Sequence, residues 1–142
     1  MEGHIRVAIR SVITAQGERE EMCQTGRGLL RHDEDGYHLR YSAADETGER
    51  SNNALKMTGE GITVHNTSTG YTLQLNPEQA TVLRLQAGGS VLEMGIETRR
   101  VHWTLEGDEQ GEIMMEYTML SGGIPISDVC LRIKIEKEDK ER

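Results

Sequence analysis

Apolar and polar residues alternate along this chain with a period of two, and this alternation constrains the fold more than any other feature. In the first alternating run, Ile5, Val7 and Ile9 share one face of an extended strand while the intervening polar side chains share the other. The last run, residues 129–136, repeats the pattern. A helix would require a period of about 3.6, so the sequence predicts an all-β protein.

Turn-forming segments interrupt the alternation at short and fairly regular intervals, which predicts about ten strands. The expected strands are 4–13, 18–31, 37–44, 54–57, 62–66, 71–75, 81–86, 91–105, 112–120 and 127–137. Strands joined by tight turns form an antiparallel meander, which leaves two exposed edges unless it closes. We therefore expect one closed antiparallel barrel in residues 1–137, sealed by its first and last strands, and a charged C-terminal tail in residues 138–142.

Two features predict local irregularities in long strands. In the expected strand 91–105, Ile96 is at an even position, whereas Val101 and Trp103 are at odd positions, so regular alternation would place them on opposite faces. One extra residue at 99–100 would place all three on the same face. That arrangement is a β-bulge. The glycines of segment 26–28 predict a bend or a bulge in the second strand. Strands that curl into a barrel need such kinks.

Segment 76–84 is compatible with two structures. Asn76, Pro77 and Gln79 occupy the positions that begin a helix, so a short helix is one alternative. The alternation of Val82 with Leu83 in the residues that follow suits a strand instead. We expect a turn followed by a strand.

Composition bounds the partners and the compartment. The 142 residues carry 16 Lys and Arg against 24 Asp and Glu, so the net charge is −8 and polyanions are repelled. We therefore expect neither nucleic acid nor an anionic membrane as a partner. The chain shows no signal-like start and no apolar run of the roughly 18 residues that a membrane span needs, so we expect a cytoplasmic protein. Cys23 and Cys130 are expected to be reduced in that compartment.

Short motifs along the chain resemble those of a known family. They are Arg27-Gly28, Leu39-Arg40-Tyr41, and residues 53–57, 70–73, 91–98, 111–113 with Tyr117, and 131–135. In order and spacing they are similar to the YwiB-like family of small, uncharacterised bacterial β-barrel proteins. The resemblance implies a calycin-like barrel, the architecture of lipocalins and fatty-acid-binding proteins, in a bacterial cytoplasm, and it implies no reaction. The chain departs from the family around residues 75–89, where aromatic residues are usual, because it contains no Phe.

Motifs for catalysis or metal binding are missing from the sequence. The five histidines have no paired spacing, neither cysteine has a Cys-x-x-Cys partner, and no nucleophile elbow, P-loop or dinucleotide fingerprint occurs. We expect no catalytic residue, no metal and no cofactor. An enzyme is therefore the function with the least support.

A ligand cavity is the leading functional hypothesis, because a barrel of about ten strands encloses more volume than ordinary side chains fill. The candidate ligand-binding residues, grouped near the predicted bulge and an open end, are Arg40, Tyr41, Arg99, Arg100, His102, Trp103 and Tyr117. An arginine inside the barrel would need an anionic ligand group, whereas arginines on strands usually face solvent.

The alternative function is a protein-interaction module. In that case the barrel is packed shut, and an exposed face bearing Met114 and Met119 contacts a second copy of the chain or another protein.

Overall fold

The structure, a computed structural model, describes residues 2–106 and 110–138 as a ten-stranded β-sheet protein. The strands are β1 (Glu2–Ala15), β2 (Glu18–Asp33), β3 (Gly36–Ala44), β4 (Arg50–Thr58), β5 (Gly61–Asn66), β6 (Tyr71–Leu75), β7 (Thr81–Ala87), β8 (Ser90–Glu106), β9 (Gln110–Ser121) and β10 (Ile124–Lys137). Within the described residues, no helix has the length and apolarity needed to cross a membrane.

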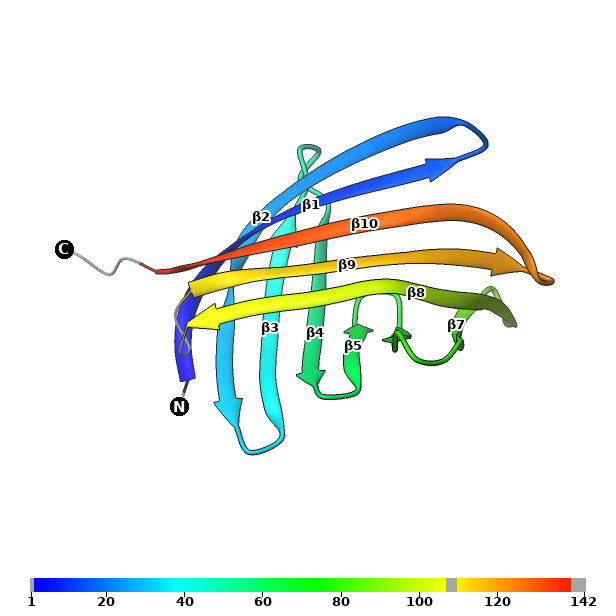
Figure 1. The fold of residues 1–142 in the computed structure, drawn as a ribbon. Helices are drawn as coiled ribbons and strands as arrows, with labels where there is room; N and C mark the ends of the chain where they lie inside the picture. The colour runs from blue at the N-terminus through cyan, green and yellow to red at the C-terminus, as the bar shows by residue number, and fades with distance from the viewer. Residues whose placement is uncertain (1, 107–109, 139–142) are drawn as a thin grey trace.

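The sheet closes into a barrel in which every strand pairs with its neighbours in the chain and β1 pairs with β10. That closing pair is antiparallel and extends from Ile5 opposite Lys137 to Thr14 opposite Asp128. The predicted closed meander is therefore confirmed. Figure 1 shows two groups of strands: β8, β9, β10 and β1 run across the direction of the shorter β3, β4 and β5.

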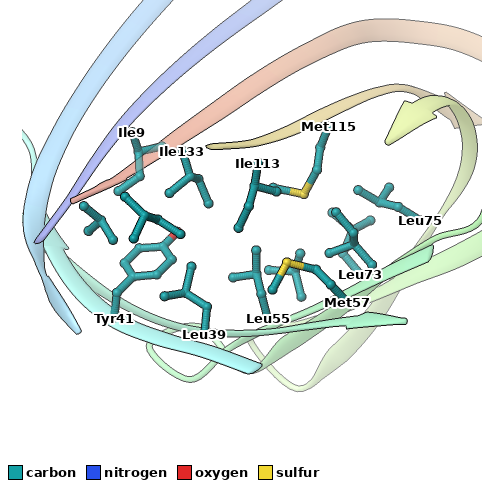
Figure 2. Close-up of a cluster of buried hydrophobic side chains, with 14 of the residues drawn as sticks. Ile9, Leu39, Tyr41, Leu55, Met57, Leu73, Leu75, Ile113, Met115 and Ile133 are labelled. Atoms are coloured by element: carbon teal, nitrogen blue, oxygen red, sulfur yellow. The ribbon is translucent and has the colours of Figure 1, made fainter. Parts of the chain in front are cut away.

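Alternation along each strand places one set of side chains inside the barrel. Ile5, Leu39 and Ile113 are fully buried, and apolar residues from β1, β9 and β10 face those from β3 to β6. Figure 2 shows these two walls packed against each other, with Ile9, Ile133 and Met115 opposite Leu39, Leu55 and Met57. The barrel therefore has a packed apolar core over much of its length.

The bulge in β8 is confirmed. The register between β8 and β9 shifts between Thr98 and Arg100, so Arg99 is the extra residue. As a result, Ile96 on one side of the bulge and Val101 on the other both contact the core.

In segment 26–28 the structure shows a bend and no bulge. The register of β2 is unbroken against both β1 and β3. A Cβ atom on Gly28 would overlap the carbonyl oxygen of Arg40, and one on Gly26 would overlap that of Ser42. Only glycine permits this close approach. Figure 1 shows the resulting curvature, as β2 passes from the long crossing strands to the short ones.

Segment 76–80 is a turn, as expected, and β7 begins at Thr81. The carboxamide oxygen of Asn76 accepts a hydrogen bond from the backbone N–H of Glu78 at 2.9 Å, and the Asn76 carbonyl accepts one from Gln79 at 3.3 Å. Asn76 therefore caps a turn and does not begin a helix.

Cys23 and Cys130 are both free. They lie on β2 and β10 with β1 between them, two strand spacings or about 10 Å apart, which is beyond the reach of a disulfide. At the C-terminus, Glu138 pairs with Arg27 at 3.1 Å, and its N–H donates to the carbonyl of His4 at 3.2 Å. The rest of the predicted tail, residues 139–142, lies outside the described residues.

Candidate functional site

The structure divides the seven predicted ligand-binding residues between the two faces of the barrel. Three of them, Tyr41, Trp103 and Tyr117, point inward: Tyr41 is 8% exposed, and the other two pack against the core. The other four are exposed on the outer face, namely Arg40, Arg99, Arg100 and His102. The predicted set does not converge on one site, and whether any of its members binds a ligand stays a prediction.

The outward residues near the bulge make contacts on the outer surface. Arg99 lies 4.0 Å from a carboxylate oxygen of Asp128, and Arg100 contacts the sulfur of Met114 at 3.4 Å. Both arginines are exposed on the outer face of the barrel. Solvent-facing arginines, the alternative considered for these strands, are what the structure contains.

Four adjacent strands place a row of polar side chains inside the barrel. Tyr41 on β3 is opposite Asn53 on β4, Asn53 is opposite Asn66 on β5, and Asn66 is opposite Tyr71 on β6. Both asparagines are buried, at 9% and 6% exposure. The four side chains therefore form a continuous row along the inner surface of the barrel, from β3 to β6, next to the apolar core.

The facing wall contributes two more polar side chains. Thr98 on β8 is opposite Tyr117 on β9, and both belong to the inward phase. The Tyr71 phenol is close enough to raise the pKa of both Tyr41 and Tyr117 electrostatically. Three of the four tyrosines of the chain thus come together inside the barrel. We call this set, Tyr41, Asn53, Asn66, Tyr71, Thr98 and Tyr117, the interior polar cluster.

The two asparagines are held by hydrogen bonds. The Asn66 amide donates to the Asn53 carboxamide oxygen at 2.9 Å, and the Asn53 amide donates to the Ser51 hydroxyl at 3.3 Å. The Asn66 carboxamide oxygen accepts bonds from the N–H and the hydroxyl of Thr69, at 2.8 and 2.9 Å. These hydrogen bonds, which include those from Thr69 in the β5–β6 loop, fix the orientation of both side-chain amides.

The hydroxyls of the cluster are less well satisfied. The Thr98 hydroxyl is fully buried without a hydrogen-bond partner. The phenol oxygens of Tyr41 and Tyr117 also bond to no described residue, but they are not fully buried, although most of each side chain is. Burial raises the pKa of both phenols far above the ordinary value, so they stay neutral donors. Burial also raises the pKa of Tyr71, against a smaller lowering by its hydrogen bond with the Asn66 side chain.

A surface groove opens at the same end of the barrel. It has a volume of about 230 Å³ and lies between the β1–β2 hairpin and the β3–β4 loop. Ser11, Ile13 and Met22 line it from the hairpin, and Asp45 and Thr47 line it from the loop. Asp45 lies four residues beyond Tyr41, and Ile13 is opposite Val129, the neighbour of Tyr117. We call this feature the entrance groove, because Asp45 connects it along β3 to Tyr41 and Ile13 connects it across the sheet to Tyr117.

The sequence contained a signal for the residues that the prediction missed. Asn53 shares the phase of the buried Leu55, Asn66 shares that of Val64, and Tyr71 shares that of Leu73. A polar residue on an apolar phase is predicted to be buried, and buried polar groups require partners.

The chemistry available at the cluster is neutral hydrogen bonding. Among the described residues, the buried polar or charged positions are Asn53 and Asn66, and no group of His, Cys, Asp or Glu is arranged to hold a metal ion. The described part of the interior therefore presents neutral hydrogen-bonding groups.

The methionines proposed for an interaction face do not form one. Met114 is only 6% exposed, because it lies beneath neighbouring side chains that include Arg100 on the outer face. Met119 packs against the interior core. An exposed methionine surface is therefore a prediction that the structure contradicts.

Residues 7–133 match the family model of a domain of unknown function (DUF1934). The chain is also similar to the crystal structure of the YwiB protein from Bacillus subtilis, with a TM-score of 0.82 and 19% identity, over 97% of this chain and 94% of that chain. At this identity the similarity concerns the fold, and it confirms the resemblance drawn from the short motifs. No curated protein matches the chain.

Proposed function

The chain belongs to the DUF1934 family of unknown function, and from that premise we propose that its barrel binds a small neutral molecule at the interior polar cluster. The observation that carries the proposal is the Thr98 hydroxyl, which is buried without a protein partner in the same interior layer as the largely buried side chains of Tyr41 and Tyr117. Leaving a buried donor unsatisfied costs about 1–3 kcal/mol, so water or a ligand is needed to complete the bond of Thr98.

The chemical class of the ligand follows from the surroundings of the cluster. Apolar side chains such as Ile96 and Leu73 adjoin the polar row, and no buried charge is present among the described residues. A largely apolar ligand with one or two hydrogen-bond acceptors, such as a carbonyl or an ether, fits this environment. A free carboxylate or phosphate would be desolvated without a counter-charge.

Barrel architecture supports the same proposal by analogy. Eight-stranded lipocalin-like barrels hold one small ligand in their mouth, and a barrel with more strands has a larger diameter. The entrance groove, at about 230 Å³, provides a concave approach to the cluster end of this barrel.

Native mass spectrometry of protein purified from a bacterial host tests the proposal. Wild-type protein is expected to carry a small molecule above the 15.9 kDa of the chain, and denaturation should release it. The triple variant Tyr41→Phe, Tyr71→Phe, Tyr117→Phe keeps the rings and removes the hydroxyls, so the adduct should be lost. Tyr37→Phe is the matched control, because Tyr37 stacks on His32 at 4.1 Å near the β2–β3 turn. Equal adducts on all three proteins, or a bare wild-type chain, would contradict the proposal.

Self-association is the second candidate function. Ile124 and Ile126 at the start of β10 are 67% and 39% exposed, and Val91 and Leu92 on β8 are exposed as well. Exposed aliphatic side chains of this size suit contact with a second copy. A dimer mass for a ligand-free chain would favour this function.

We infer a bacterial, cytoplasmic setting for the protein. The similar YwiB structure comes from Bacillus subtilis. The exposed free thiol of Cys23 suits a reducing compartment.

A further inference from the structure

The outer faces of β2 to β5 bring basic side chains together. In one row, Arg31 is opposite His38, His38 is opposite Lys56, and Lys56 is opposite Thr63. In the adjacent row, Arg40 is opposite Ala54, and Ala54 is opposite His65. A groove of about 260 Å³ lies over these two rows, and we call it the outer groove.

Charge in the outer groove opposes that of the whole molecule. The chain has a net charge of −8, yet none of the residues lining the groove is Asp or Glu. Asp33 at its edge lies 3.6 Å from Arg31 and 3.3 Å from His38. Within the described part of the chain, no carboxylate forms an ion pair with Arg40 or Lys56.

Such an arrangement costs free energy in the absence of an anion. Arg31 and Lys56 flank His38 in one row and Arg40 lies in the adjacent row, so three positive charges are gathered within a few strand positions and repel one another. The Nε2 atom of His38 lies 3.3 Å from a carboxylate oxygen of Asp33, which also pairs with Arg31, whereas no described carboxylate pairs with Arg40 or Lys56. An anion over the row would neutralise this remaining positive charge.

The outer groove has short side chains at its base and longer basic side chains around it. Ala54 and Thr63 are short side chains between the longer basic ones. His65 is oriented by a hydrogen bond between its Nδ1 atom and the Thr72 hydroxyl at 2.9 Å. Three permanent cations and two imidazoles around a short floor match a compact anion with more than one negative charge.

We propose that the outer groove binds the phosphoryl group of a small phosphorylated molecule. Its volume of about 260 Å³ suits one or two phosphates with a small attached group. Nucleic acid is the less favoured occupant, because the net charge of −8 repels an extended polyanion beyond the groove. The outer groove lies on the opposite face of β3 and β4 from the interior polar cluster. Phosphate binding in the groove and ligand binding in the interior can therefore be tested independently.

Nuclear magnetic resonance with inorganic pyrophosphate as the probe tests the proposal. The ring signals of His38 and His65 are expected to shift on titration, while those of His4 and His102, elsewhere on the outer face, stay in place. The double variant Arg40→Gln, Lys56→Gln should weaken binding by about tenfold or more, since each removes a charge-assisted contact. Arg40 and Lys56 are exposed, so the variant should keep its fold, which circular dichroism checks.

The control Arg6→Gln, Arg99→Gln removes the same charge from exposed positions elsewhere on the barrel and should bind within about twofold of wild type. The proposal would be overturned if the ring signals of His38 and His65 did not shift at pyrophosphate concentrations up to about 10 mM, because a dissociation constant above that value is far too weak for specific recognition. Equal shifts at all four histidines, or equal losses in the two double variants, would overturn it as well. A short single-stranded DNA that binds the groove more tightly than pyrophosphate would replace the small molecule with nucleic acid.

Discussion

The inner and outer faces of β3 and β4 differ in chemistry although they share a backbone. Tyr41 and Asn53 point into the barrel as neutral hydrogen-bonding groups, whereas Arg40 and Lys56 point outward as cations. Because successive side chains alternate across a strand, one short segment supplies both surfaces. The comparison shows that strand parity places neutral polar side chains on the inner face of β3 and β4 and cationic side chains on the outer face.

Gly28→Val should have the largest effect, because it disturbs the strand pair on which both faces depend. Its side chain would overlap the carbonyl of Arg40 and force β2 away from β3. We expect a loss of about 3 kcal/mol or more in the free energy of unfolding, measured by chemical denaturation. Gly59→Ala is the control, since a Cβ there meets no atom within 4 Å. A Gly28→Val variant as stable as this control would refute the close approach.

The next largest contrast lies between two neighbours on β4. Leu55→Ala should cost about 2–5 kcal/mol because it leaves a cavity in the core, where Leu55 is 2% exposed. Lys56→Ala, on the exposed face, should change the unfolding free energy by less than about 0.5 kcal/mol. Urea denaturation of both variants measures the difference. Equal effects would contradict the placement of Leu55 in the core and of Lys56 on the outer face.

A smaller contrast is expected within the polar residues of β4. Asn53→Ala removes the acceptor of the Asn66 amide and leaves a buried donor unpaired, at a cost of about 1–3 kcal/mol. Asn52→Ala changes an exposed side chain and should be near neutral. Thermal unfolding of the pair distinguishes them. If Asn53→Ala were neutral, the amide network would not contribute to the stability of the interior polar cluster.

The last expected effect is absent at neutral pH and develops only at alkaline pH. The folded barrel raises the pKa of Tyr41 and Tyr117, so their contribution to stability is complete below about pH 10 and is lost above it. We expect the free energy of unfolding to fall by about 1.4 kcal/mol per pH unit for each tyrosine. Chemical denaturation at pH values between 10 and 11, in roughly half-unit steps, measures this slope. The double variant Tyr41→Phe, Tyr117→Phe should show a shallower slope. An unchanged slope would place both phenols in solvent.

Much of the fold was predictable because alternation and turn residues are local signals. The strands and the irregularity at Arg99 follow from the phase of neighbouring residues, and the β1–β10 closure was predictable because an open meander would leave two exposed edges. The tight turns at Gln16–Gly17 and Gly122–Gly123 were missed, and they extend both hairpins beyond the expected strand ends. These turns use backbone with positive φ, which two-residue hairpins favour.

The site was less predictable, because convergence depends on register between strands far apart in the chain. Tyr41 shares the phase of Leu39, so alternation alone could have separated it from Arg40. That Tyr71 lies near both Tyr41 and Tyr117 follows from pairings across the closed sheet. No local pattern encodes such pairings.

The most direct test of a neutral interior site compares tyrosine-labelled protein, by nuclear magnetic resonance, as purified and after denaturation and refolding. The account predicts that the ring signals of Tyr41, Tyr71 and Tyr117 move when the bound molecule is removed, while those of Tyr37 stay in place. Identical spectra before and after this treatment, with no molecule released, would contradict the claim that the barrel interior is a binding site.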